Sequence, residues 1–128
     1  MTESDLKDRT KSFAVRVLKL ADALPGSVSG KALANQISRS GTSVAANYRA
    51  ACRAKSTADF ISKLGIVEEE ADETLFWLEL AVEANLIPAK KLKPLMREAE
   101  ELLKITVASI KTTRKKQPIP KSALRNSK

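Results

Sequence analysis

The stretch from Ser29 to Lys55 constrains the fold most, because it combines a helical apolar pattern with an unbroken basic character. No acidic residue occurs between Asp22 and Asp59. At about 100° per residue, the side chains of this stretch fall into three stripes of one amphipathic helix. The stripes are an apolar face (Leu33, Ala34, Ile37, Gly41, Val44, Ala45, Tyr48, Cys52), a polar seam (Gln36, Ser40, Ser43, Asn47) and a cationic flank (Lys31, Arg39, Arg49, Arg53). We therefore expect a helix that packs through one side and binds anions through the other.

Three further segments repeat apolar residues at steps of three and four, so the sequence predicts helices over residues 5–24, 29–54, 57–84 and 89–115. Pro25-Gly26 separates the first two helices, and Asn85 with Pro88 separates the last two. Ser56 opens a capping-box pattern ahead of the third helix. Short links between long helices favour an all-α fold, an antiparallel up-down-up-down four-helix bundle over residues 1–115. Residues 116–128, with two prolines and several charges, are predicted to form a flexible basic tail.

The charge balance points to an anionic partner. The chain has 23 basic and 15 acidic residues, a net charge of +8. Nucleic acid is the first candidate and an anionic membrane surface the second, while the alternative is a soluble protein that is simply basic. No run approaches the roughly 18 apolar residues of a membrane span, and the N-terminus lacks a signal-peptide core. We expect a cytoplasmic protein that does not bind membranes.

Residues suited to catalysis are scarce. The chain has no histidine, which removes the commonest acid–base and triad chemistry, and it has no glycine-rich phosphate loop. The third helix is rich in carboxylates, but a di-iron bundle also needs Glu-x-x-His pairs. The single cysteine, Cys52, lies on the apolar face and is expected to act as a small hydrophobe. We expect no enzymatic activity, no cofactor and no metal.

The third predicted helix carries apolar residues on two sides. The main stripe is Phe60, Leu64, Val67, Ala71, Leu75, Leu78 and Val82, and a second set is Ile66, Phe76, Trp77, Leu80 and Ala84. One stripe suffices for a monomeric bundle. The second set is therefore predicted to contact another subunit, unless a broad stripe meets two neighbours within one bundle.

Two groups of cations are the candidate phosphate ligands, because arginine and lysine bind phosphate oxygens. They are Lys31, Arg39, Arg49, Arg53 and Lys55 in and after the second helix, and Lys111, Arg114, Lys115 and Lys116 at the end of the fourth. Aromatic residues are only 4%, so base stacking is not expected. The alternative is that the helix-two arginines pair with the acids of the third helix, in the same chain or in a neighbouring subunit.

The residues assembled so far resemble a bacterial family. Segments 33–51 and 56–80 and the turn at 85–88 carry the resemblance. Gln36, Arg39, Ser40, Ser43, Asn47, Asp59, Phe60, Leu64, Glu69 or Glu73, and Trp77 match its pattern, whereas Ala50 stands where many members carry an acid. The family is the bacterial four helix bundle proteins, which include the 23S rRNA intervening-sequence proteins.

This resemblance implies an antiparallel bundle that assembles as a ring, most often a homopentamer. It is also similar to the accessory protein of diversity-generating retroelements, a pentameric basic barrel that binds nucleic acid and a reverse transcriptase. Two functions follow as hypotheses. The first is a ring-forming protein that binds RNA or DNA with little sequence specificity. The second is an interaction scaffold or accessory subunit whose basic helix docks an acidic protein partner or a neighbouring subunit.

Overall fold

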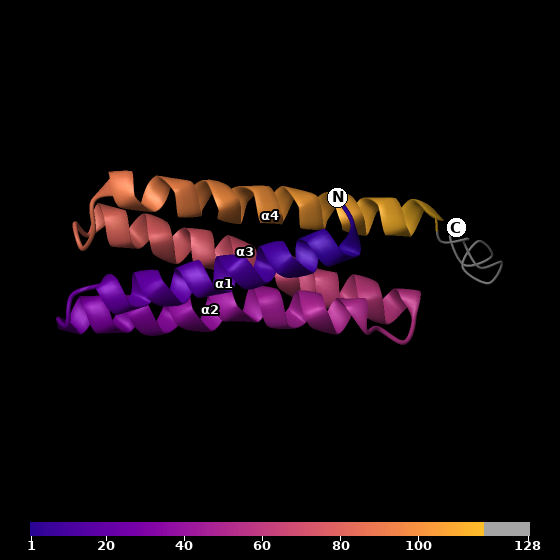
Figure 1. The fold of residues 1–128 in the computed structure, drawn as a ribbon, viewed down its shortest axis with the longest axis horizontal. Helices are drawn as coiled ribbons and strands as arrows, with labels where there is room; N and C mark the ends of the chain where they lie inside the picture. Colours follow the sequence, from indigo (N-terminus) through magenta and orange to yellow (C-terminus); the bar gives the residue numbers. More distant parts are fainter. Residues whose placement is uncertain (117–128) are drawn as a thin grey trace, which may run out of the picture.

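The fold is an antiparallel bundle of four long helices connected in sequence order (Figure 1). The computed structural model describes residues 1–116, which form α1 (Glu3–Ala23), α2 (Val28–Cys52), α3 (Thr57–Glu83) and α4 (Ala89–Lys116). Successive helices run in opposite directions, as the course of the chain in Figure 1 shows. The predicted fold class is confirmed, and each helix begins and ends within two residues of its predicted range.

The C-terminal boundary differs slightly from the prediction. Lys116, expected to begin the tail, is the last residue of α4, because no proline or glycine occurs between Pro94 near the start of this helix and Pro118. The rest of the predicted tail, residues 117–128, lies outside the described residues. None of the helices over residues 1–116 combines the length and apolar character that a membrane-spanning helix needs.

Side-chain caps explain where three of the helices begin. The Thr2 hydroxyl and the Asp5 carboxylate form a reciprocal capping box at the start of α1. Ser27 Oγ accepts from the Gly30 amide at 3.1 Å, and Ser56 Oγ accepts from the Asp59 amide at 3.0 Å. After α3, Asn85 adopts a left-handed conformation with φ of 57°, as its place before the turn predicted.

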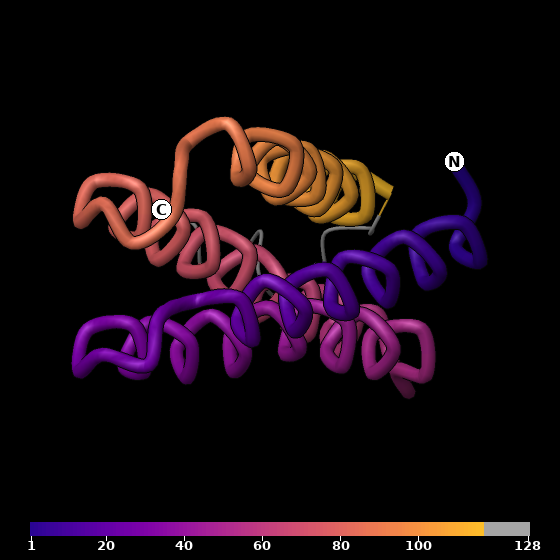
Figure 2. The backbone as a smooth tube through the Cα atoms, turned by 60° about the vertical axis from the view of Figure 1, so that its left-hand side comes forward, coloured from indigo at the N-terminus to yellow at the C-terminus, as the bar shows by residue number. Residues whose placement is uncertain are grey.

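Each helix packs mainly against its neighbour in sequence. The pairs α1 with α2, α2 with α3, and α3 with α4 make extensive contacts, whereas α1 and α4 touch only slightly. Figure 2 shows α4 lying apart from α1 over much of its length. The two helices are joined by Arg9, which donates to both Glu98 carboxylate oxygens at 2.7 and 2.6 Å and also to Glu101. This bond to the guanidinium holds the pKa of Glu98 below its usual value.

Large apolar side chains from all four helices fill the core. The largest fully buried ones are Phe13, Ile37, Leu64, Leu78, Leu92 and Leu102. The backbones of α1 and α2 approach closely at Gly41, where an added Cβ would lie 2.5 Å from Val17 Cγ1. A helix-interior glycine costs roughly 1 kcal/mol relative to alanine. Here its lack of a side chain permits the close packing against Val17.

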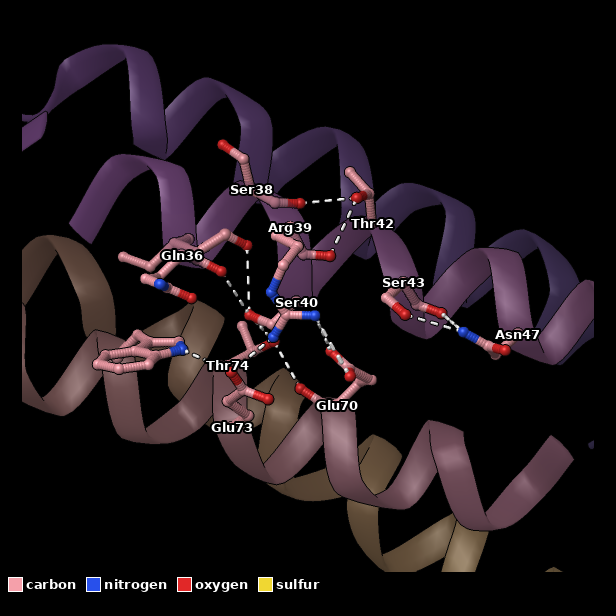
Figure 3. Close-up of polar contacts among 12 residues, drawn as sticks. Gln36, Ser38, Arg39, Ser40, Thr42, Ser43, Asn47, Glu70, Glu73 and Thr74 are labelled. Carbon is pink, nitrogen blue, oxygen red and sulfur yellow. Dashed lines mark hydrogen bonds and ion pairs between the residues drawn. The ribbon is translucent and has the colours of Figure 1, made fainter. Parts of the chain in front are cut away.

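One member of the predicted polar seam is in fact part of the core. Ser40 is fully buried, and its hydroxyl lies 2.8 Å from the Thr74 hydroxyl and 3.0 Å from the Gln36 carbonyl (Figure 3). The Thr74 hydroxyl also reaches the Glu70 carbonyl at 2.7 Å. Burial is possible because both hydroxyls are satisfied, so they carry no desolvation penalty for a missing bond.

Candidate nucleic-acid interface

A basic groove lies between α1 and α2 on the outer side of the bundle. A hollow of about 400 Å³ is lined by Lys7, Asp8, Lys11, Ala45, Ala46 and Arg49. A second hollow shares Ala46 and Arg49 and continues along α2 to Ala50 and Arg53. We use the name basic groove for the cations Lys7, Lys11, Arg49 and Arg53 around this alanine floor.

The helical repeat positions these four cations. Lys7 and Lys11 are four residues apart on α1, about 6 Å along the helix, and Arg49 in the last turn of α2 is four residues before Arg53 at its C-cap. Both pairs face outward, and all four side chains are exposed. Alanines at 45, 46 and 50 keep the floor low, because larger side chains would fill the space between the pairs. The result is two short rows of cations across a shallow channel.

The electrostatics of the groove favour an anion. Within residues 1–116, none of its four cations makes an ion pair, and Asp8 is the one carboxylate in the lining. Arg49 also lies in the last turn of α2, where the helix dipole favours positive charge. The groove contains no aromatic side chain on which a base could stack. Its chemistry suits phosphate oxygens rather than base edges.

Arg39 does not line the groove, because it lies ten residues before Arg49 on α2, about 15 Å away along the helix axis. Its guanidinium donates to Glu70 Oε2 at 3.2 Å and to Glu73 Oε1 at 2.5 Å on α3 (Figure 3). The Trp77 indole donates to the same Glu73 oxygen at 3.2 Å. The bond to Arg39 lowers the pKa of Glu73. For Arg39, therefore, the structure favours the alternative interpretation, pairing with acids of the same chain.

The other predicted phosphate ligands are spread over the two ends of the bundle. Lys31 is exposed near the start of α2, and Lys55 is exposed in the link to α3. Lys111, Arg114, Lys115 and Lys116 are exposed on the last turns of α4. Arg49 and Arg53 are the predicted ligands that the structure brings together.

Lys7 and Lys11 were missed by sequence reasoning. Their spacing on α1 was visible, but it became informative only once α1 was known to pack antiparallel beside the outer flank of Arg49. Lys7 and Arg49 are far apart in sequence, and the pairing of α1 with α2 brings them to the same groove.

The predicted subunit-contact set is partly covered by its own chain. Phe76 is 50% exposed, and its ring meets the Trp77 ring edge-on at a centroid distance of 5.2 Å. Trp77 and Leu80 are half-buried and pack against the bundle core. Ile66 is half-buried outside that core cluster, and Ala84 is exposed. The outer face of α3 therefore keeps an apolar centre at Phe76 among its carboxylates.

The described residues offer little for covalent or metal chemistry. Cys52 is half-buried, and burial raises the pKa of its thiol, which keeps it protonated. Burial likewise raises the pKa of the nearby Tyr48 phenol. Across residues 1–116, acidic and cysteine side chains nowhere gather into a group of three suited to a metal ion.

Comparison with known proteins gives the family. Residues 2–108 match the family model described as 23S rRNA-intervening sequence protein. The chain belongs to this family. The match begins at the cap of α1 and ends within α4, so it covers nearly the whole bundle of this 23S rRNA-intervening sequence protein. The family assignment that the resemblance predicted is confirmed.

A solved structure agrees with this assignment. A crystal structure at 1.70 Å resolution of a protein with unknown function from the S23 ribosomal protein family of Bacteroides thetaiotaomicron is 38% identical. The similarity covers 87% of this chain and 99% of that one, with a TM-score of 0.81. No curated protein matches this 23S rRNA-intervening sequence protein.

Proposed function

We propose that this protein is a non-enzymatic, ring-forming protein of the bacterial cytoplasm that binds nucleic-acid backbone, RNA or DNA, with little sequence specificity. The basic groove carries this proposal. It presents two pairs of exposed cations, Lys7 with Lys11 and Arg49 with Arg53, without ion-pair partners in residues 1–116. Cations at one-turn spacing match the regular repeat of phosphates along a strand.

The absence of base-reading groups from the groove sets its selectivity. Phosphate contacts position a protein on nucleic acid but carry no sequence information. Aliphatic and cationic side chains line the groove, so little discrimination among sequences is expected. Affinity should instead fall steeply as salt rises, because each neutralised phosphate releases counterions.

Ring formation, as a homopentamer, is the second part of the proposal. The half-exposed Phe76 and the neighbouring Ile66, Leu80 and Ala84 supply an apolar contact on α3 that one chain does not fully cover. Each copy in a ring would present one basic groove, and several grooves on one rigid body raise avidity without new contacts.

A charge-reversal variant tests the groove. Arg49→Glu with Arg53→Glu should weaken binding of a labelled duplex at low salt at least tenfold and lower its salt slope, while sedimentation shows an unchanged assembly. Arg49→Lys with Arg53→Lys is the matched control, because it keeps the charge and should retain most of the affinity. Wild-type protein that fails to bind RNA and DNA duplexes at low salt, or binds them independently of salt, would contradict the proposal.

A protein-interaction scaffold is the second candidate. The contact of Arg39 with Glu70 and Glu73 favours this function, because it shows a cation of α2 forming ion pairs with carboxylates of another helix. An acidic protein or a neighbouring subunit would then occupy the groove. In that case the Arg49→Glu and Arg53→Glu variant loses its assembly or its protein partner, and nucleic-acid binding is weak from the start.

A further inference from the structure

A second line of cations runs along the outer face of α4. It consists of Lys90, Lys93, Arg97, Lys104, Lys111 and Lys115, which we call the cationic ladder. Four of its members recur every seven residues, so they stay on one side of the helix. The core residues of α4, such as Leu95, Ala99 and Leu102, lie on the opposite side, and all six cations are exposed. From first to last, the ladder extends about 38 Å at 1.5 Å per residue.

The positive charge of the ladder is largely uncompensated. Within residues 1–116, none of its members makes an ion pair. Two of the glutamates of α4, Glu98 and Glu101, are held by Arg9 of α1. Glu100 is the acid that remains among the ladder cations, and it leaves a clear excess of positive charge along the whole helix.

The ladder is separate from the basic groove. The groove lies between α1 and α2, whereas α4 packs mainly on α3 and does not pack on α2. In Figures 1 and 2, α4 and α2 run along opposite edges of the bundle. One ligand segment lying in the groove therefore does not cover the outer face of α4.

The composition of this face indicates the class of partner. Large exposed apolar side chains occur at Met1, Val15, Leu18, Val28 and Phe76, and none of these is on α4. A helix that binds a membrane surface inserts apolar side chains, and a protein interface usually has an apolar or aromatic centre. Nucleic-acid backbone requires only cations in reach of phosphates. Of these three kinds of partner, nucleic-acid backbone is the one whose requirement the ladder meets.

We propose that the cationic ladder of α4 is a second nucleic-acid surface, so that each protomer holds two separate segments of backbone. This inference takes its class of ligand, nucleic acid, from the proposed function. Binding at the ladder does not require the basic groove. Two segments held on opposite edges of one bundle would be kept apart at a fixed distance by the helices between them.

Lysine protection tests the location directly in the unmodified protein. An amine-reactive reagent is applied with and without an excess of a 30-base-pair RNA duplex, and modification is read by mass spectrometry. Lys93 and Lys104 should be protected by the duplex, whereas exposed Lys19 on α1 should react equally in both samples. Equal reactivity of Lys104 with and without bound duplex overturns the inference.

Variants test the contribution of the ladder to affinity. Arg97→Gln with Lys104→Gln should lower the salt slope of duplex binding by about 1 for each phosphate that the variant no longer neutralises. Lys19→Gln with Lys63→Gln removes the same charge away from groove and ladder, and should leave the slope near the wild-type value. Circular dichroism confirms that each variant is folded.

The groove variant separates the two surfaces. Arg49→Glu with Arg53→Glu should retain salt-sensitive binding that Arg97→Gln with Lys104→Gln then removes. Complete loss of binding in the groove variant, or a ladder variant no weaker than its control, overturns the ladder and leaves the proposed function standing. Wild-type protein that binds no duplex overturns both. Phosphatidylglycerol vesicles that compete with duplex for the ladder and bind more tightly would assign this face to membranes instead.

Discussion

The close approach of two helices in this bundle, at Gly41 and Val17, predicts the effect of adding one methyl group. In Gly41→Ala, the new Cβ would lie 2.5, 2.8 and 2.9 Å from three carbons of Val17, whereas carbon atoms pack comfortably at about 3.5 to 4.0 Å. Val17 is fully buried and β-branched, so its side chain cannot rotate away. The backbones of α1 and α2 must separate instead, at a cost of about 1–3 kcal/mol.

A second glycine provides the matched control. Gly65 lies within α3, and an added Cβ there meets nothing within 4 Å. Gly65→Ala should therefore stabilise the protein by about 0.5–1 kcal/mol through helix propensity alone. Because Gly41→Ala gains the same propensity, the difference in unfolding free energy between the two variants isolates the steric cost.

Urea denaturation of both variants at one protomer concentration measures this difference, since the stability of an assembly depends on concentration. We expect Gly41→Ala to be less stable than Gly65→Ala by about 1–3 kcal/mol. Restoring space with Val17→Ala should reduce the cost of Gly41→Ala in a double-mutant cycle. Equal stabilities of the two glycine variants would refute the reasoning. A destabilising Gly65→Ala would instead indicate that a second copy packs against this position.

Three further outcomes are expected. Ser40→Ala and Thr74→Val should each cost about 1 kcal/mol or less in urea denaturation, because the remaining hydroxyl keeps a backbone carbonyl to bond; a much larger effect would show that the pair itself is essential. Arg9 lowers the pKa of Glu98, so this contribution to stability is complete above about pH 4.3 and disappears as pH falls through the lowered pKa. Glu98→Gln should therefore flatten the acid-induced decrease in stability below about pH 4.3, and a curve parallel to wild type contradicts this. Arg39→Gln should leave duplex affinity within about twofold and change stability little, since the Arg39 guanidinium is exposed; a tenfold weaker affinity would place Arg39 in the binding surface.

The fold was predictable from sequence because its signals are local. Apolar spacing marked each helix, Ser56 marked the beginning of α3, and Asn85 marked the last turn. Ser40 was misplaced because its angle on the helix lies at the edge of the apolar face. Only the position of Thr74 on α3 decides whether that edge is buried.

The candidate site was less predictable because it depends on which helices meet. Helical angle alone grouped Arg39 with Arg49 and Arg53. In the bundle, the Arg39 side chain reaches the carboxylates of α3, whereas Arg49, ten residues further along α2, lies beside Lys7 and Lys11 of α1. A one-dimensional pattern cannot tell which flank a neighbouring helix will cover.

The slight contact between α1 and α4 has a consequence for how the chain reaches this structure. Packing is concentrated between consecutive helices, so most native contacts join segments that are near in sequence. Such low contact order favours rapid folding. During synthesis on the ribosome, each new helix can dock on the helix made just before it, without waiting for the C-terminus to return to the N-terminus.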